Sequence, residues 1–173
     1  MILLATLVHD AGLDLSGPAL RREAVRAIVM RGRKLLLLLS PAAGDYKFPG
    51  GGVEAGETDA AALARELREE CGLRAIQVLA EFGQVVEHAR PIEPGYAVFS
   101  MTSRYYLCEA TGPAGAQQLD AYERALGLLP AWVDIDQAIR ANSAALRGGE
   151  RAARWVRRET LVLEQISRRM LGG

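Results

Sequence analysis

The chain has 173 residues, with 21 Lys and Arg against 21 Asp and Glu, and half of its residues are hydrophobic. This composition is typical of a folded globular protein and argues against a disordered chain. Proteins dedicated to binding double-stranded nucleic acid carry an excess of positive charge, and the formal charge of this chain is zero. We therefore do not expect nucleic acid as the partner.

The cysteines and the N-terminus indicate a cytoplasmic protein. Cys71 and Cys108 are too few for a disulfide framework and lack the spacing of a zinc site, so we expect free buried thiols. The apolar start of the chain has no basic segment before it, and no apolar run approaches the roughly 20 residues that cross a bilayer. We expect one domain over residues 1–173, with no membrane contact.

Strands are predicted for most of the first third of the chain. The pattern indicates strands over residues 1–8 and 24–30, a basic turn at 31–34 and a buried strand over 35–39. A short strand over 46–49 then runs into three glycines, residues 50–52.

A helix is predicted over residues 58–71, because Gly72 ends an amphipathic stretch there. A strand within 73–86, a loop over 88–95, a long strand over 96–111 and a Gly-rich loop over 112–118 follow. A short strand over 131–135 leads into a helix to about residue 142, and a last amphipathic helix over about 149–170 is expected to pack on the domain. Single helices between strands favour a mixed α/β fold of the α+β type over repeated βαβ units.

The helix over 58–71 carries the strongest chemical signal. Glu66, Glu69 and Glu70 are three and four residues apart, so a helix brings their carboxylates to one face. The apolar residues of the adjacent face are Ala60, Leu63, Ala64, Leu67 and Cys71. Carboxylates crowded at the edge of a buried face repel one another unless a cation neutralises them, and hard oxygen ligands suit Mg²⁺ or Mn²⁺. A Glu57–Arg65 ion pair would tie the preceding loop to this helix.

Residues 51–73 (GGVEAGETDAAALARELREECGL) resemble the signature of the Nudix hydrolases. That signature is Gly, five residues, Glu, seven residues, then Arg-Glu-apolar-any-Glu-Glu-any-Gly-apolar. The matching residues are Gly51, Glu57, Arg65, Glu66, Leu67, Glu69, Glu70, Gly72 and Leu73.

The resemblance implies an α/β/α sandwich with a mixed, curved sheet, and metal-dependent cleavage of a nucleoside diphosphate linked to another group. It implies that Glu66, Glu69 and Glu70 hold the metal with the carbonyl of Gly50. Glu66 is our first choice of base, and Glu57, Arg65 and Glu69 join it in the catalytic set. Nudix proteins are often homodimers, and that remains an analogy here.

Other candidates rest on weaker patterns. Asp120 and Glu123 are candidates for an acid from a later loop, although solvated loop or helix-start acids explain them as well. Phe48, Tyr105 and Tyr106 could stack on a base, but core positions are the commoner role of aromatic residues. Arg158 on the last helix is a candidate phosphate contact.

Two other functions stay open from the sequence. A nucleotide sensor without turnover would share the fold, although the intact acidic signature favours catalysis. An RNA 5′-end pyrophosphohydrolase is favoured only by the basic last helix. The residues do not select a substrate among ADP-ribose, nucleotide sugars and (d)NTPs.

Overall fold

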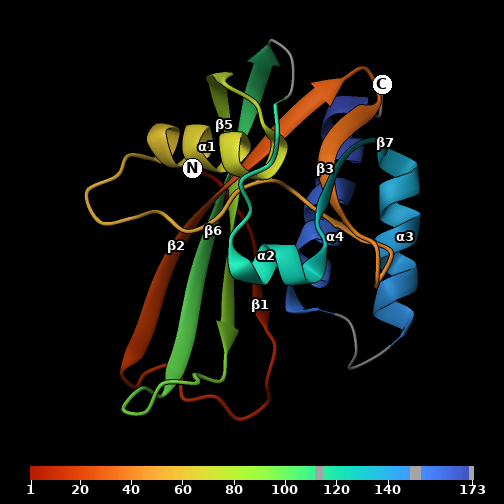
Figure 1. Ribbon diagram of the computed structural model, residues 1–173. Helices are drawn as coiled ribbons and strands as arrows, with labels where there is room; N and C mark the ends of the chain where they lie inside the picture. The colour runs from red at the N-terminus through yellow and green to blue at the C-terminus, as the bar shows by residue number, and fades with distance from the viewer. Residues whose placement is uncertain (112–114, 149–152, 172–173) are drawn as a thin grey trace.

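The computed structural model describes residues 1–111, 115–148 and 153–171. Its elements in chain order are β1 (Leu3–Val8), β2 (Ala19–Arg31), β3 (Lys34–Ser40), β4 (Asp45–Lys47), α1 (Asp59–Cys71), β5 (Ala75–Ala89), β6 (Val98–Thr111), α2 (Ala121–Leu126), β7 (Leu129–Asp134), α3 (Ile135–Arg147) and α4 (Arg154–Ile166). A π-helical turn, Ser167–Leu171, follows α4 (Figure 1).

The seven strands of the described residues form one mixed sheet in the order β1-β5-β6-β2-β3-β4, with β7 also paired to β3. β1 runs parallel to β5, and β2 runs parallel to β6, whereas the β5–β6, β2–β3, β3–β4 and β3–β7 pairs are antiparallel. Only one end of β2 pairs with β3, at Met30 and Arg31. Before that point, the loop around Gly50–Gly52 lies along β2 instead, through the bonds from Val25 N to Gly51 O and from Ala27 N to Pro49 O.

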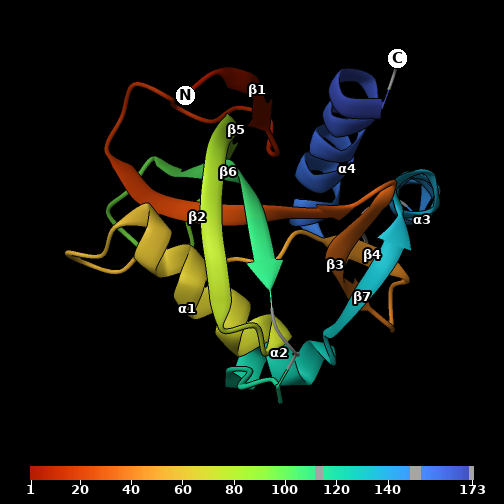
Figure 2. The same ribbon diagram turned by 90° about the horizontal axis from the view of Figure 1, so that it is seen from above.

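Two hydrophobic cores lie on opposite faces of this sheet. Leu63 and Leu67 of α1 pack in one core, and Leu163 of α4 packs in the other. Figure 2 shows α1 and α4 on opposite sides of the strands. Successive strand residues divide between the cores as an extended chain requires: Tyr105 joins the α4 core and Tyr106 the α1 core. The predicted mixed α+β sandwich is therefore confirmed.

Some predicted boundaries are corrected by the structure. β5 continues through His88 to Ala89, where a loop was expected, because its end pairs both with the next strand, β6, and with β1, which is distant in sequence. Ala60 is exposed, and Ala62 takes the buried position on α1. The short helix α2 was not predicted. The last helix begins at Arg154 among the described residues, and the expected start at 149 lies outside them.

Among the helices that the structure describes, none is long and apolar enough to span a membrane. Cys71 and Cys108 are both buried and free, as expected from the sequence.

Candidate functional site

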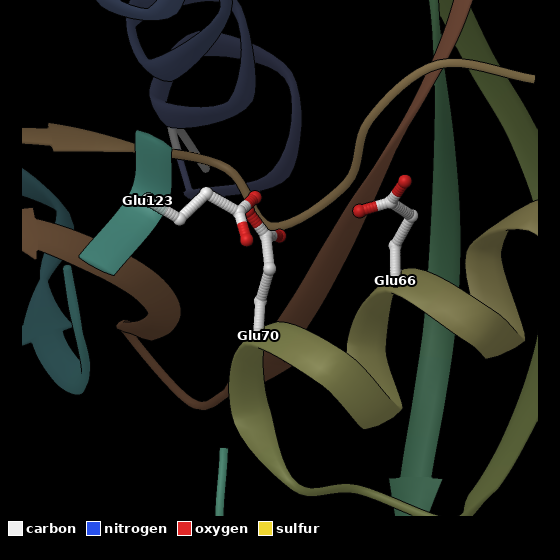
Figure 3. A group of neighbouring side chains, drawn as sticks. All are labelled: Glu66, Glu70 and Glu123. Carbon is white, nitrogen blue, oxygen red and sulfur yellow. The ribbon is translucent and has the colours of Figure 1, made fainter. Parts of the chain in front are cut away.

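Local capping fixes the ends of α1 and therefore the placement of its acids. The Thr58 side chain accepts a hydrogen bond from Ala61 N, which satisfies a free amide of the first turn. At the other end, Gly72 adopts φ 69°, a left-handed conformation that suits glycine and stops the helix. Glu66 and Glu70 lie one turn apart between these caps and point to the same side (Figure 3).

Three carboxylates converge at this side of α1. Glu66, Glu70 and Glu123 each offer an oxygen atom, and these atoms lie within 4.8 Å of one another. Figure 3 shows Glu123 reaching from α2 toward Glu70. Glu69, which the sequence grouped with Glu66 and Glu70, lies outside this trio, with its side chain 32% exposed and 3.5 Å from Arg65.

The loop before α2 positions Glu123. The side-chain amide of Gln117 donates hydrogen bonds to the carbonyls of Glu70 and Leu128, at 2.7 and 3.1 Å. A capping box then starts α2, because the Asp120 carboxylate accepts from Glu123 N while the Glu123 carboxylate accepts from Asp120 N. Asp120 therefore acts as the cap of α2, and Glu123 is the acid of this segment that joins the cluster.

Arg65 ties the preceding loop to the cluster. Its guanidinium contacts both oxygens of Glu57 at 2.9 and 3.1 Å, the carbonyl of Gly52 at 2.9 Å and Glu66 at 2.7 Å. The predicted Glu57–Arg65 ion pair is thus confirmed. The pair lowers the pKa of Glu57 through hydrogen bonds from Arg65, and it raises the pKa of Arg65. Arg65 orients Glu66 through the same guanidinium.

Glu70 is the most deeply buried acid of the cluster. Burial raises its pKa to about 7, although Lys47 Nζ lies 2.9 Å away and Gly50 N donates to its other oxygen at 2.5 Å. Burial also raises the pKa of Glu66 against the opposing effect of Arg65. A cation close to such buried acids stabilises their ionised form and lowers their pKa values.

The loop passes so close to the cluster that two of its glycines leave little room for a side chain. A Cβ on Gly51 would overlap the carboxylate of Glu66, and one on Gly50, at φ 135°, would overlap the carbonyl oxygen of Val25. The loop backbone therefore lies directly against the acids. Hard carboxylate oxygens, close spacing and partial burial together fit a divalent cation such as Mg²⁺ or Mn²⁺. The carbonyl of Gly50, a ligand implied by the resemblance, accepts a hydrogen bond from Arg26.

The aromatic candidates do not meet at the cluster. Phe48 and Tyr105 are fully buried and pack edge to face, with ring centroids 5.5 Å apart. The Tyr106 hydroxyl donates to Asp59 at the start of α1. Arg158 is buried between Glu87 and Glu159. None of these four predicted substrate contacts therefore lies beside the three carboxylates.

Sequence reasoning missed Lys47 and Arg26, which contact the cluster and its loop. The sequence did contain a signal for Arg26, because it is a charged residue inside the apolar stretch VRAIVM. A charge in the interior of a protein usually has a specific partner. Lys47 is one of only two lysines in the chain and lies three residues before the first glycine of the loop, Gly50. Neither signal identified the partner, because both contacts join segments far apart in sequence.

Comparison with known proteins gives a family and a fold. A model of the NUDIX domain matches residues 20–158. The solved structure of a NUDIX hydrolase from Nitrosomonas europaea aligns with a TM-score of 0.58 at 22% identity, over 86% of this chain and 90% of that one. At this identity, the likeness shows the fold.

Two curated relatives match part of the chain. An RNA pyrophosphohydrolase of a Nitratiruptor species is 35% identical over 81 residues, which cover 45% of this chain and 52% of that protein. A CTP pyrophosphohydrolase of Escherichia coli is 49% identical over 57 residues, which cover 31% of this chain and 42% of that protein. The chain therefore spans about half the length of the curated relatives it matches.

Proposed function

The chain belongs to the NUDIX domain family, and on this basis we propose that it is a metal-dependent pyrophosphohydrolase. Its substrate would be a nucleoside diphosphate linked to a further group. The observation that carries this proposal is the convergence of Glu66 and Glu70 of α1 with Glu123 of α2. The pyrophosphohydrolase names of both curated relatives support the same class of reaction.

In this proposal, Glu66, Glu70 and Glu123 hold Mg²⁺ or Mn²⁺, with Glu69 and the carbonyl of Gly50 as further ligands implied by the family signature. When bound, the metal neutralises phosphate charge and orients a water for attack on phosphorus. The residues of the chain do the rest: Arg65 and Glu57 fix the position of Glu66, and Lys47 holds Glu70.

Glu66 is the proposed general base. Burial raises its pKa, which makes its carboxylate a better proton acceptor near neutral pH. Glu123 is the alternative base, because it is the cluster acid that comes from a different helix. The two assignments predict different variants. If Glu66 is the base, Glu66→Gln should retain metal binding and lose turnover, and if Glu123 is the base, Glu123→Gln should do so.

The experiment measures phosphate or nucleotide release with Mg²⁺ and with Mn²⁺ over a substrate panel. The panel holds ADP-ribose, nucleotide sugars, dinucleoside polyphosphates, canonical and oxidised (d)NTPs, and RNA with a 5′-triphosphate. RNA is included because one relative carries the name RNA pyrophosphohydrolase. Glu70→Gln is assayed beside the wild type, with Glu164→Gln, an exposed residue of α4, as the matched control.

We expect metal-dependent release from one substrate class, lost in Glu70→Gln and kept in Glu164→Gln. Full turnover in a folded Glu70→Gln protein would contradict the role of the cluster. Nucleotide binding without turnover of any substrate would favour a sensor over a hydrolase.

A further inference from the structure

The strand β4 lies at an edge of the sheet, and side chains bond its outward backbone groups in place of a further strand. β4 pairs with β3 on one side, and both α3 and α4 pack on it. The side-chain amide of Asn142, on α3, accepts a hydrogen bond from Tyr46 N at 2.7 Å and donates one to Tyr46 O at 2.9 Å. Asn142 has no exposed surface, so it satisfies the two backbone groups that a neighbouring strand would otherwise bond.

A second buried side chain bonds the next outward amide of the same segment. The carboxylate of Glu159, on α4, accepts a hydrogen bond from Phe48 N at 3.4 Å, which is longer than the two bonds of Asn142. The other oxygen of Glu159 accepts from Arg158, which compensates its charge. Asn142 and Glu159 therefore bond the backbone on either side of Lys47, and we call this pair of residues the β4 clamp.

The direction of the Lys47 side chain follows from this arrangement. Successive residues of a strand face opposite sides of the sheet, and Tyr46 and Phe48 both lie in the core that packs against α4. Lys47 therefore points to the other side, toward α1, where its Nζ lies 2.9 Å from Oε1 of Glu70. A slip of β4 by one residue would turn Lys47 away from α1.

The segment that follows the clamp holds both oxygens of Glu70. Lys47 Nζ donates to Oε1, and Gly50 N, three residues further along, donates to Oε2 at 2.5 Å. A lysine side chain is long and flexible, so holding its ammonium in one place costs conformational entropy. A backbone that is fixed on both sides of Lys47 leaves only the side-chain torsions to be ordered.

We propose that Asn142 and Glu159 are positioning residues, which bond the backbone of β4 around Lys47 and thereby set the Glu70 carboxylate in the orientation that turnover requires. Asn142 has the larger effect, because it makes two short bonds to one residue. The effect on turnover rests on the proposed function, whereas the position of Lys47 is measurable without it.

The first test follows the Lys47 ammonium directly. Lys34 and Lys47 are the two lysines of the chain, and Lys34 is exposed, so protein labelled with ¹⁵N in lysine alone contains its own reference signal. In EDTA, the bond to Glu70 should protect the Nζ protons of Lys47 from exchange with water, whereas those of Lys34 should exchange freely. Asn142→Ala should accelerate the exchange of Lys47 by about tenfold or more, because it frees β4 to open locally.

Ile135→Val is the matched control, because Ile135 is fully buried on the same helix as Asn142. It should leave the exchange of Lys47 unchanged. Asn142→Ser, which keeps a small polar group beside Tyr46, replaces Asn142→Ala if that variant does not fold, and the same acceleration is expected. Unchanged exchange of Lys47 in a folded Asn142 variant would overturn the inference.

The second test measures turnover of the substrate that the panel identifies. Asn142→Ala should lower kcat by about tenfold with little change in KM, because it displaces Glu70 and leaves substrate contacts in place. In a Lys47→Met background, the same substitution should change kcat by less than about twofold, because the two residues act through one route. A full tenfold loss in that background, or an equal loss in Ile135→Val, would overturn the inference.

The two proposals fail in distinguishable ways. Faster exchange of Lys47 in the Asn142 variants, without turnover of any substrate by the wild type, would remove the hydrolase and the role of the clamp in turnover. Turnover that depends on Glu70, together with unchanged exchange of Lys47 in these variants, would remove the clamp and keep the hydrolase.

Discussion

Lys47 Nζ lies 2.9 Å from Oε1 of Glu70, a carboxyl group with no exposed surface. The strand β4 and the helix α1 that carry these residues meet only in the folded chain. The contact supplies a positive charge to a cluster of three acids, and yet burial still keeps the pKa of Glu70 at about 7. The site is therefore incompletely neutralised by the protein alone.

We expect the metal-free protein to lose stability as the pH rises toward 7. Below the ordinary carboxyl pKa of 4.5, Glu70 is neutral in both the folded and unfolded states, and its contribution is fully present. Between 4.5 and about 7 the unfolded chain ionises first, so the contribution is lost, by roughly 3 kcal/mol in total. Thermal melts in EDTA from pH 4 to 8 measure this loss. Glu70→Gln should have a flatter profile, and identical profiles would contradict the assignment.

Glu123 and Asp120 should respond differently to removal of their charge. Glu123→Gln removes a cluster oxygen, so turnover should fall by about 100-fold or more, in the range of lost acid–base groups. Asp120→Ala removes the cap of α2 and should cost about 1 kcal/mol of stability. Activity of each folded variant is compared with its melting temperature. A larger loss of turnover in Asp120→Ala would indicate that the helix, and not the Glu123 carboxylate, matters.

Arg65→Lys should impair the site although it keeps the charge. A lysine cannot contact both oxygens of Glu57 and also reach Glu66, because its single ammonium lacks the planar fork of Arg65. We expect kcat to fall by about tenfold. Arg68→Lys, at an exposed position of the same helix, is the control and should keep wild-type kcat. Equal kcat values in both variants would show that the contacts of Arg65 with Glu57 and Glu66 have no part in turnover.

Gly51→Ala should leave the fold intact and displace the carboxylate of Glu66. The new methyl group would meet the flexible end of the Glu66 side chain, which can move, and no backbone atom is among its closest contacts. Turnover should fall by at least about tenfold. In Gly50→Ala the methyl group would instead meet the backbone of β2, and the protein should be strongly destabilised. Activity and melting temperature of the two variants separate these effects, and an active Gly51→Ala protein would contradict the first.

Much of the cluster was readable from the sequence because it is local. Thr58 and Gly72 mark the ends of α1, and helical geometry places Glu66 and Glu70 one turn apart whatever packs around them. The Glu57–Arg65 pair follows from the same helix and the loop just before it. The placement of Tyr105 and Tyr106 in different cores has a local cause too, because neighbouring residues of a strand face opposite sides of the sheet.

The sequence by itself therefore determined the fold class, the acidic face of α1 and the Glu57–Arg65 ion pair. The helix face and the ion pair depend on residues within about two turns of one another, and the fold class follows from a family signature. Only the tertiary structure decided that Glu123 joins the trio while Glu69 stays outside it, and that Arg26 contacts the carbonyl of Gly50 beside the cluster. Those contacts depend on how α1 and α2 pack against the sheet and on how the glycine loop lies along β2. Docking is governed by burial and strand pairing between distant segments, and no local spacing encodes it.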